Sequence, residues 1–362
     1  MDLNNLLHPK YYFSSNHTKI EFDKIFSNQW IFVAMEEDLS ENNMFITLSI
    51  FNYPIVIQNF KGEIKAFQNI CPHRFNLIQT ERTGKRPFVC QYHSWSFDSN
   101  GKPNTKSLKS LYDVESESFG NVCVKNISLE KVGKFYFINL SKKPSDIKEY
   151  LGGFYEKLLE ISSSITDRFY FDDDFQKVNW KVIVENVIEA YHCPSIHKDT
   201  LFGMGFCSVP ENNQEYVSGH SVADYPKNND FAVNKMLKYL ENRTFKHDTF
   251  RHYFIFPNLL ISSTEGTSIY VGNVLPNNES STILRKRFYD VKFHDDFVPR
   301  KSIHNAFLEM VKTSINSILF EDKVILEQVQ KNLEFVNDKY ILGNQEQRIV
   351  QFHNHYTTLI NE

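Results

Sequence analysis

The chain has 362 residues, and its hydrophobic and charged fractions of 41% and 23% are those of a globular protein with room for two domains. The net charge of −4 gives no reason to expect nucleic acid or an anionic membrane surface as a partner. No apolar run approaches the roughly 18 to 20 residues that span a bilayer, and the first residues lack the basic-then-apolar layout of a signal peptide.

Short β-type runs dominate the first part of the chain. A helix-like segment over residues 22–26 precedes a strand-like run over residues 30–34. Between residues 44 and 140, β-type stretches alternate with turn signals. These stretches include residues 53–58, 88–92 and 134–140. Strands at this spacing predict a small all-β domain over residues 38–145, preceded by a lead-in over residues 1–37.

The second part of the chain mixes helical and strand patterns. Residues 147–163 and 178–191 have helical periodicity, residues 251–291 have the pattern of several antiparallel strands, and residues 304–336 have that of one long helix. Together they predict a second domain over residues 146–362, an antiparallel sheet with helices of helix-grip type. The predicted fold class is therefore α+β, with the all-β domain first.

Five cysteines are an odd number for a disulfide framework, and they are widely scattered. We therefore expect a protein of the reducing cytoplasm. Cys123, Cys193 and Cys207 have no ligand partner at a suitable spacing, so core packing or incidental exposure is expected for them. Four further histidines are isolated in the sequence and are interpreted as ordinary residues: His220, His247, His252 and His294.

Two Cys-His pairs in the all-β domain form the first candidate metal site. Cys71 and His73 are followed, after sixteen residues, by Cys90 and His93. In a [2Fe–2S] centre of Rieske type, two cysteines hold one iron and two histidines hold the other. The alternative is a tetrahedral zinc site, but zinc fingers usually group their cysteines together and their histidines together. The order found here favours Cys71 and Cys90 on one iron, with His73 and His93 on the other.

The second candidate metal site begins in the predicted helix over residues 178–191. If that helix continues to His192, then Glu185, Glu189 and His192 share one face. Pro194 then ends the helix, which lets His197 turn back toward His192 from the next segment. Two histidines five residues apart across a helix break are suitable ligands for one iron.

A carboxylate from the long C-terminal helix is expected to complete this iron site. Non-haem Fe(II) oxygenases use two histidines and one carboxylate, which leaves coordination positions open. An apolar stripe of the helix contains one acid, Asp322, and a buried carboxylate needs a cation or a proton. The other members of the stripe are Ile315, Leu319, Leu326, Val329 and Leu333. The alternatives are that the stripe is partly exposed at Asp322, that Asp322 caps a local hydrogen-bond network, or that Glu321 is the ligand.

Both motifs resemble those of the catalytic (alpha) subunits of Rieske non-haem iron oxygenases. The typical Rieske text is C-P-H-R-G followed by C-x-Y-H-G-W, and this chain matches it except that Phe75 and Ser94 replace the two glycines. The catalytic text is N-W-K-x3-(D/E)-N-x2-(D/E)-x-Y-H-x4-H, and residues 179–197 match every fixed position. The resemblance covers about residues 26–333.

This resemblance implies two cofactors, a [2Fe–2S] cluster on the four Cys and His residues and Fe(II) on His192, His197 and Asp322. It also implies that Glu189 bridges to the Rieske histidine of a neighbouring subunit, expected to be His93. Such a bridge requires a head-to-tail ring, usually a homotrimer. The chain has no nucleotide-binding text, so the electrons used with O2 are expected from a separate NAD(P)H-dependent reductase or a ferredoxin.

The resemblance favours one branch of the family for the substrate. A glutamate at the bridge position and the text of residues 321–330 are similar to choline and carnitine monooxygenases. The expected activity is hydroxylation or demethylation of a small amine or quaternary ammonium compound. The alternatives are an aromatic-ring-hydroxylating dioxygenase and, from another class, a Rieske electron-transfer protein without oxygenase activity.

Overall fold

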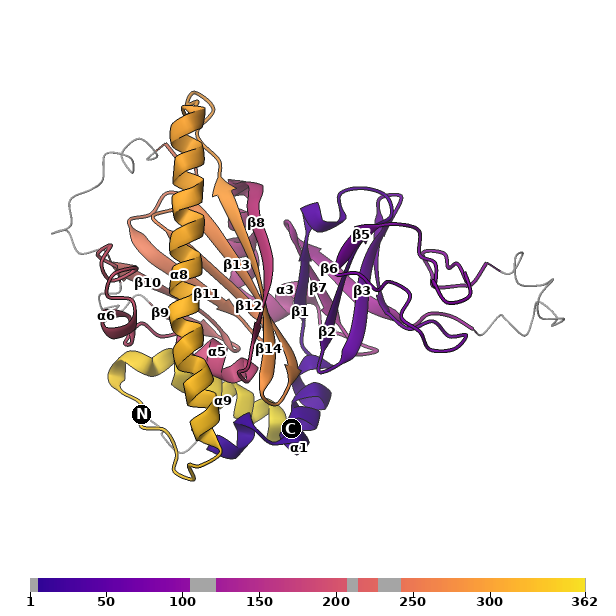
Figure 1. The fold of residues 1–362 in the computed structure, drawn as a ribbon, viewed down its shortest axis with the longest axis horizontal. Helices are drawn as coiled ribbons and strands as arrows, with labels where there is room; N and C mark the ends of the chain where they lie inside the picture. The colour runs from indigo at the N-terminus through magenta and orange to yellow at the C-terminus, as the bar shows by residue number, and fades with distance from the viewer. Residues whose placement is uncertain (1–5, 105–121, 207–213, 227–241, 362) are drawn as a thin grey trace. The chain divides into compact units, whose positions relative to one another are not determined.

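The computed structural model describes residues 6–104, 122–206, 214–226 and 242–361. The chain divides into two compact units, one formed by residues 26–147 and the other by residues 1–25 together with 148–362. Each unit is built on one seven-stranded sheet (Figure 1). Within the described residues, no helix is long and apolar enough to cross a membrane.

The predicted lead-in over residues 1–37 is shared between the two units. Residues 1–25 belong to the unit that contains the second metal motif, whereas residues 26–37 belong to the unit that contains the first. The reason is visible in β1 (Ile31–Met35), whose five residues are all buried and which pairs with β7 (Phe135–Asn139). Our domain division otherwise remains a prediction.

The unit of residues 26–147 is an antiparallel sheet with the strand order β1-β7-β6-β4-β3-β2-β5. Its remaining strands are β2 (Met44–Ile50), β3 (Tyr53–Phe60), β4 (Glu63–Gln68), β5 (Thr83–Lys85) and β6 (Asn126–Val132). The 3-10 helix η4 (Glu36–Leu39) follows β1. The short π-helix η3 (Phe22–Phe26), which the helix-like pattern predicted, ends where this unit begins. The predicted strand over residues 88–92 is wrong, because this segment forms a loop with only an isolated bridge between Val89 and Ser96.

The other unit is an antiparallel sheet with the strand order β8-β14-β13-β12-β11-β10-β9. Its strands are β8 (Ile165–Gln176), β9 (Gln214–Val217), β10 (His220–Pro226), β11 (Thr249–Ile255), β12 (Leu259–Thr264), β13 (Ser268–Asn278) and β14 (Ser281–Val291). Helix α8 (Lys301–Leu333) runs along one face of this sheet (Figure 1). The structure thus confirms the predicted antiparallel strands and the long helix.

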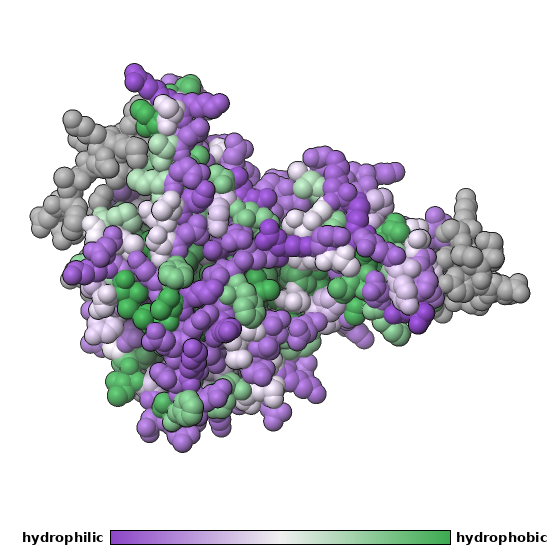
Figure 2. Space-filling view, viewed as in Figure 1, coloured by the Kyte–Doolittle hydropathy of each residue, from purple (hydrophilic) through white to green (hydrophobic). Residues whose placement is uncertain are grey.

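Shorter helices complete this unit. They are η2 (Pro9–Tyr12), α1 (Ser15–Glu21), α3 (Ile147–Leu151), α4 (Phe154–Ser164), α5 (Trp180–Val187), α6 (Cys193–Ile196), η6 (Asn344–Glu346) and α9 (Gln347–Asn361). The helix predicted over residues 147–163 is broken into α3 and α4, because Gly152 takes a positive φ of 51° between them. Figure 2 shows that the face in view is mainly hydrophilic, with apolar side chains gathered in small groups beside α8.

A buried polar network fixes α5 to both ends of the chain. Lys181 Nζ lies 2.5 Å from Glu21 Oε1, and both side chains are almost fully buried. One turn further along α5, Glu185 Oε1 accepts hydrogen bonds from the Tyr12 hydroxyl at 2.6 Å and is 2.9 Å from His353 Nε2. Buried charges need such partners. Lys181 and Glu185, which are fixed positions of the second motif, therefore hold the helix that leads toward the predicted iron site.

Candidate metal centres and substrate pocket

The two Cys-His loops have the same backbone hydrogen-bond pattern. In the first loop, the amide of Phe75 donates to the carbonyl of Cys71, and the amide of Cys71 donates to the carbonyl of Asn76. In the second loop, the amide of Ser94 donates to the carbonyl of Cys90, and the amide of Cys90 donates to the carbonyl of Trp95. These bonds replace a strand ladder over residues 88–92. The two loops therefore present their ligands from equivalent turns.

Phe75 and Ser94 are the residues that stand where the family text has glycine. Their φ angles are 61° and 59°, in the left-handed region where only glycine avoids a steric cost. The same turn geometry is therefore kept here at the cost of strain in both loops. The Phe75 ring is 78% exposed, so it gains little from packing within its own unit.

Phe75→Gly is expected to stabilise the cluster-bearing unit by about 0.5–1 kcal/mol, because relief of the left-handed strain exceeds the added freedom of the unfolded chain. Phe75→Ala is the matched control, since it removes the ring but keeps the β-carbon that causes the strain. Urea unfolding, followed by the visible absorbance of the cluster, measures the difference. Equal stability of the Gly and Ala variants would show that the backbone at this position is unstrained.

The four predicted cluster ligands lie together at the tip formed by the two loops. Cys71 and Cys90 are buried in one apolar cluster, and the ring centroids of His73 and His93 are 4.6 Å apart. His73 stacks on Trp95 at 4.8 Å between centroids, which fixes the plane of its ring. Two thiols on the buried side and two imidazoles on the outer side are the donor set of a Rieske cluster. The residues therefore fit that group.

The electrostatic setting of the two sulfurs is defined by burial and by one amide. Burial, with Cys90 close by, raises the pKa of the Cys71 thiol to about 11, so binding of iron must displace this proton. Asn76 Nδ2 donates a hydrogen bond to Cys90 Sγ at 3.9 Å. Among residues 92–97, which follow Cys90 in the second loop, only Trp95 and Phe97 are buried, and His93 is exposed.

The second motif is not one continuous helix. Helix α5 begins at Trp180, where the Asn179 side chain accepts a hydrogen bond from the Lys181 amide, and it ends at Val187. Glu189 Oε2 then accepts hydrogen bonds from the backbone amides of Tyr191 and His192 and so forms a turn. The prediction of a helix to His192 was therefore wrong. Pro194 lies in the first turn of α6, where proline is tolerated, rather than ending a helix.

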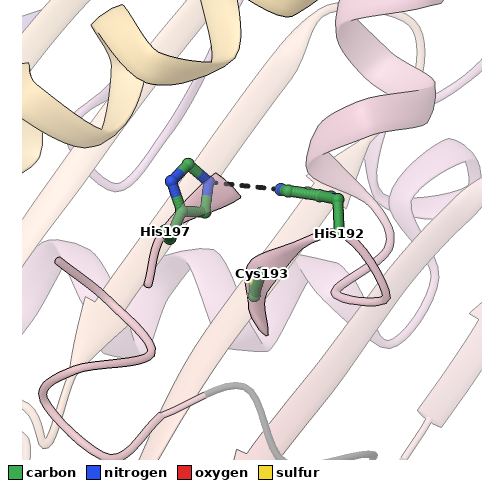
Figure 3. A group of neighbouring side chains, drawn as sticks. All are labelled: His192, Cys193 and His197. Carbon is green, nitrogen blue, oxygen red and sulfur yellow. Dashed lines mark hydrogen bonds between the residues drawn. The ribbon is translucent and has the colours of Figure 1, made fainter. Parts of the chain in front are cut away.

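His192, His197 and Asp322 converge on one point. His192 Nε2 and His197 Nε2 are 3.2 Å apart, and Asp322 Oδ1 lies 3.5 and 3.1 Å from them. Three atoms that bind one metal at about 2.1 Å, with angles of 90–109°, lie about 3.0–3.4 Å from one another. Figure 3 shows the two histidine rings directed toward each other. The three side chains thus fit a two-histidine, one-carboxylate iron site.

The lone acid of the apolar stripe is buried, as we expected, and the stripe around it is buried or half-buried. Cys193 also lies within ligand distance of the two histidines (Figure 3), but Asp322 completes the donor set typical of Fe(II) oxygenases. Cys123 is exposed, and Cys207 lies outside the described residues. Burial lowers the pKa of His197, but the nearby carboxylates of Asp322 and Glu321 outweigh burial and raise this pKa to about 9.

Each iron-site histidine has a glutamate on its other ring nitrogen. Glu189 Oε1 contacts His192 Nδ1, and Glu321 Oε2 lies 2.7 Å from His197 Nδ1. Thr200 Oγ1 donates to the same Glu321 oxygen at 2.8 Å. Such carboxylates fix the tautomer and orientation of a metal-binding histidine. Glu321, which we had considered as a rival ligand, is placed behind His197 instead.

Glu321→Ala is expected to weaken binding of Fe²⁺ to the mononuclear site by about 10- to 100-fold, the usual cost of losing a partner of a ligating histidine. Glu321→Gln is expected to lose less, because its amide oxygen can still accept from His197 Nδ1. Iron titration of protein that retains its cluster measures both effects. An iron affinity that is unchanged in the Ala variant would contradict this role.

A cavity of about 410 Å³ opens on the three iron-site residues. Strands β10–β13, helix α8 and the segment after α6 line it with mainly apolar and aromatic side chains, including Phe206, Tyr225, Phe250 and Ile318. Besides Asp322, three residues that line it carry a buried polar atom with no hydrogen-bond partner in the described structure: Asn186 (Nδ2), His252 (Nε2) and Tyr270 (the hydroxyl). Buried polar atoms without a partner in a cavity are where a bound molecule is expected to contact the protein.

Sequence reasoning missed His252 and Tyr270. His252 had been interpreted as ordinary, and only its alternation with Phe250 in β11 could have placed it on the cavity face. Two of the other isolated histidines have ordinary structural roles. His220 and His247 are hydrogen-bonded inside the fold, and burial lowers the pKa of each to about 4.

Comparison with known proteins agrees with this geometry. Residues 162–362 match the family of the ring hydroxylating alpha subunit (catalytic domain), and residues 29–111 match the Rieske [2Fe-2S] domain. The carnitine monooxygenase oxygenase subunit of Acinetobacter baumannii is 25% identical over 335 residues, which cover 90% of this chain and 85% of that protein. The glycine betaine monooxygenase oxygenase subunit of Chromohalobacter salexigens is 28% identical over 184 residues, 50% of this chain and 41% of that protein.

Solved structures share the fold. The quaternary ammonium Rieske monooxygenase CntA in complex with L-carnitine superposes with a TM-score of 0.77 at 21% identity, over 99% of this chain and 96% of that one. Naphthalene 1,2-dioxygenase from a Rhodococcus species gives 0.75 at 16% identity, over 99% and 95%. The α+β fold, with an all-β Rieske domain before the catalytic domain, is therefore confirmed. The family match covers more than half of the chain, which thus belongs to the ring-hydroxylating alpha-subunit family of Rieske oxygenases, oxidoreductases that use a [2Fe–2S] cluster and a mononuclear non-haem iron.

Proposed function

We propose that this chain oxygenates small quaternary ammonium compounds in the cavity beside the iron site. The observation that carries the proposal is the composition of the cavity wall. Glu265 and the aromatic rings of Tyr225 and Phe250 line it, whereas no lysine or arginine does so within the described ranges. Aromatic faces and carboxylates attract cations. The relatives named as carnitine and glycine betaine monooxygenases act on compounds of this class.

The roles of individual residues follow from the geometry. We propose that His192, His197 and Asp322 hold the iron, while Cys71, Cys90, His73 and His93 hold the cluster. When bound, the cluster would store electrons and the iron would activate O2. The chain itself orients the iron ligands through Glu189 and Glu321 and surrounds the substrate with apolar side chains that exclude water. The convergence of three iron ligands beside a cavity disfavours a simple electron carrier.

We also propose that the working unit is a homotrimer in the cytoplasm, served by a separate reductase or ferredoxin. His93 is exposed at the tip of its loop, where it can be reached by Glu189 of a neighbouring subunit. Phe75 and Tyr92 beside it are 78% and 52% exposed. Large apolar rings in one exposed group support burial against another subunit. Sedimentation of the purified protein tests the trimer.

A substrate screen tests the proposed activity. The holoenzyme would be supplied with a surrogate reductase, and O2 uptake would be measured with carnitine, glycine betaine, choline and naphthalene. We expect product formation that matches O2 uptake with at least one quaternary ammonium compound and none with naphthalene. Coupled turnover of naphthalene alone would instead identify an aromatic-ring dioxygenase.

A further inference from the structure

A row of polar side chains crosses the cavity face of the sheet. His252 of β11 is paired with Ser262 of β12, and Ser262 is paired with Tyr270 of β13. All three line the cavity that contains the iron-site residues. Paired residues on neighbouring strands have their side chains on the same face, so the row presents adjacent polar groups to one bound molecule.

His252 has only one possible tautomer. Its Nδ1 lies 3.4 Å from Arg348 Nη1 and 3.3 Å from Arg348 Nη2, and a guanidinium can only donate. The histidine proton must therefore be on Nε2. Burial, together with Arg348, holds the pKa of His252 well below its usual range, so the ring is neutral at physiological pH. His252 therefore offers one N–H donor.

This donor is unused within the described structure. His252 is 2% exposed, and its Nε2 has no hydrogen-bond partner among the described residues. An unsatisfied buried donor costs roughly 1–3 kcal/mol. A group in the cavity that accepts a hydrogen bond would remove this cost, and Nε2–H belongs to a side chain that lines that cavity.

Arg348 determines what kind of acceptor fits best. Its guanidinium is 2% exposed, and its hydrogen bonds go to Ser221 and His252. Among the described residues, no carboxylate lies within ion-pair distance of it. A buried guanidinium keeps its charge, and it polarises the His252 ring toward a stronger Nε2–H donor. An anionic oxygen is therefore favoured over a neutral one.

We propose that His252, backed by Arg348, binds the carboxylate of the substrate through Nε2–H. This inference rests on the proposed function and makes the substrate class more specific. The substrate is a betaine, a small molecule that carries both an ammonium group and a carboxylate. Hydrogen bonds to charged groups contribute about 1.5–3 kcal/mol, which corresponds to about 10- to 100-fold in affinity. His252 is thus a specificity-determining residue, and choline, which lacks the carboxylate, is a weaker ligand.

Two amide variants distinguish loss of the Nε2–H donor from a general structural effect of replacing His252. In His252→Gln the terminal amide nitrogen reaches about the place of Nε2, whereas in His252→Asn the amide ends near Nδ1 and can only contact Arg348. Tyr253→Phe, on the opposite face of β11, is the control. Calorimetry on the oxidised holoenzyme measures the Kd of γ-butyrobetaine and of tetramethylammonium, which has no acceptor.

We expect His252→Asn to weaken binding of γ-butyrobetaine by about 10- to 100-fold. The Kd of tetramethylammonium should change by no more than about twofold. His252→Gln should weaken binding of γ-butyrobetaine less than His252→Asn does. Equal losses of affinity for both probes, or no loss for γ-butyrobetaine, would overturn the inference.

A third probe, 5,5-dimethylhexanoate, keeps the carboxylate but has no ammonium charge. If it binds with the same dependence on His252 while tetramethylammonium does not bind at all, the carboxylate site stands and the ammonium substrate class fails. If neither carboxylate binds the unmodified protein, the inference is wrong.

Discussion

Asp322→Ala is expected to abolish binding of the mononuclear iron and all turnover, while the red-brown colour of the cluster remains. The carboxylate oxygen is one of the three converging atoms proposed to bind the iron, 3.1 Å from His197 Nε2 and 3.5 Å from His192 Nε2. Loss of a mere outer partner costs about 10- to 100-fold in metal affinity, so loss of a ligand should exceed 100-fold. Iron content per cluster and coupled O2 uptake are the two measurements.

Glu309→Ala is the matched control for this variant, because Glu309 lies on the same helix with a 70% exposed side chain. It should keep both metals and full activity. Asp322→Asn adds a second comparison, since an amide has the same shape but binds iron more weakly. Substantial turnover by Asp322→Ala would mean that another residue completes the iron site.

Glu189→Ala is expected to stop the reduced cluster from being reoxidised in a single turnover, although both metals can still be bound. We expect the rate to fall by about 100-fold or more, the upper range for loss of a partner of a ligating histidine. The structure adds a second effect that the sequence did not indicate. Because Glu189 contacts His192 Nδ1 and the amides of Tyr191 and His192, the Ala variant should also bind iron more weakly.

These two effects of Glu189 can be separated with Glu189→Gln. The amide keeps one oxygen, which can accept either from His192 Nδ1 or from the backbone amides of Tyr191 and His192, so iron binding should weaken less than in the Ala variant. Its charge is lost, and so is the carboxylate proposed to meet His93 of the neighbouring subunit. Single-turnover reoxidation is measured with saturating Fe²⁺ in all variants. Unchanged rates in both Ala and Gln variants would remove Glu189 from the electron path.

Local patterns in the sequence predicted those elements whose own residues determine their structure. The apolar stripe of α8 is continuous over many turns, and the single acid within it marked Asp322 as a buried ligand. The alternating strands β11 to β14 were predicted in the same way. In both cases the periodicity of one segment is enough to identify the buried face.

The errors arise where side chains compete with the backbone or where distant segments meet. Helical periodicity continues through Glu189 and His192, but the Glu189 carboxylate binds backbone amides and ends α5 early. His252 needs the register of three strands and the position of α9 before its role can be seen, because Arg348 lies 96 residues away in sequence. Residues 1–25 likewise belong to the same unit as residues 148–362, and no local pattern in the sequence predicts this association.

The buried network around Lys181 has a consequence for the order in which the two units can fold. Glu21 precedes Lys181 by 160 residues, whereas His353 follows Glu185 by 168. The unit of residues 26–147 is continuous in sequence and can complete its sheet as soon as it has been made. The other unit instead needs segments far before and far after α5 in the sequence to complete its buried network. The sheet of residues 26–147 can therefore form on its own, whereas the predicted iron site becomes ordered only after these distant segments have met α5.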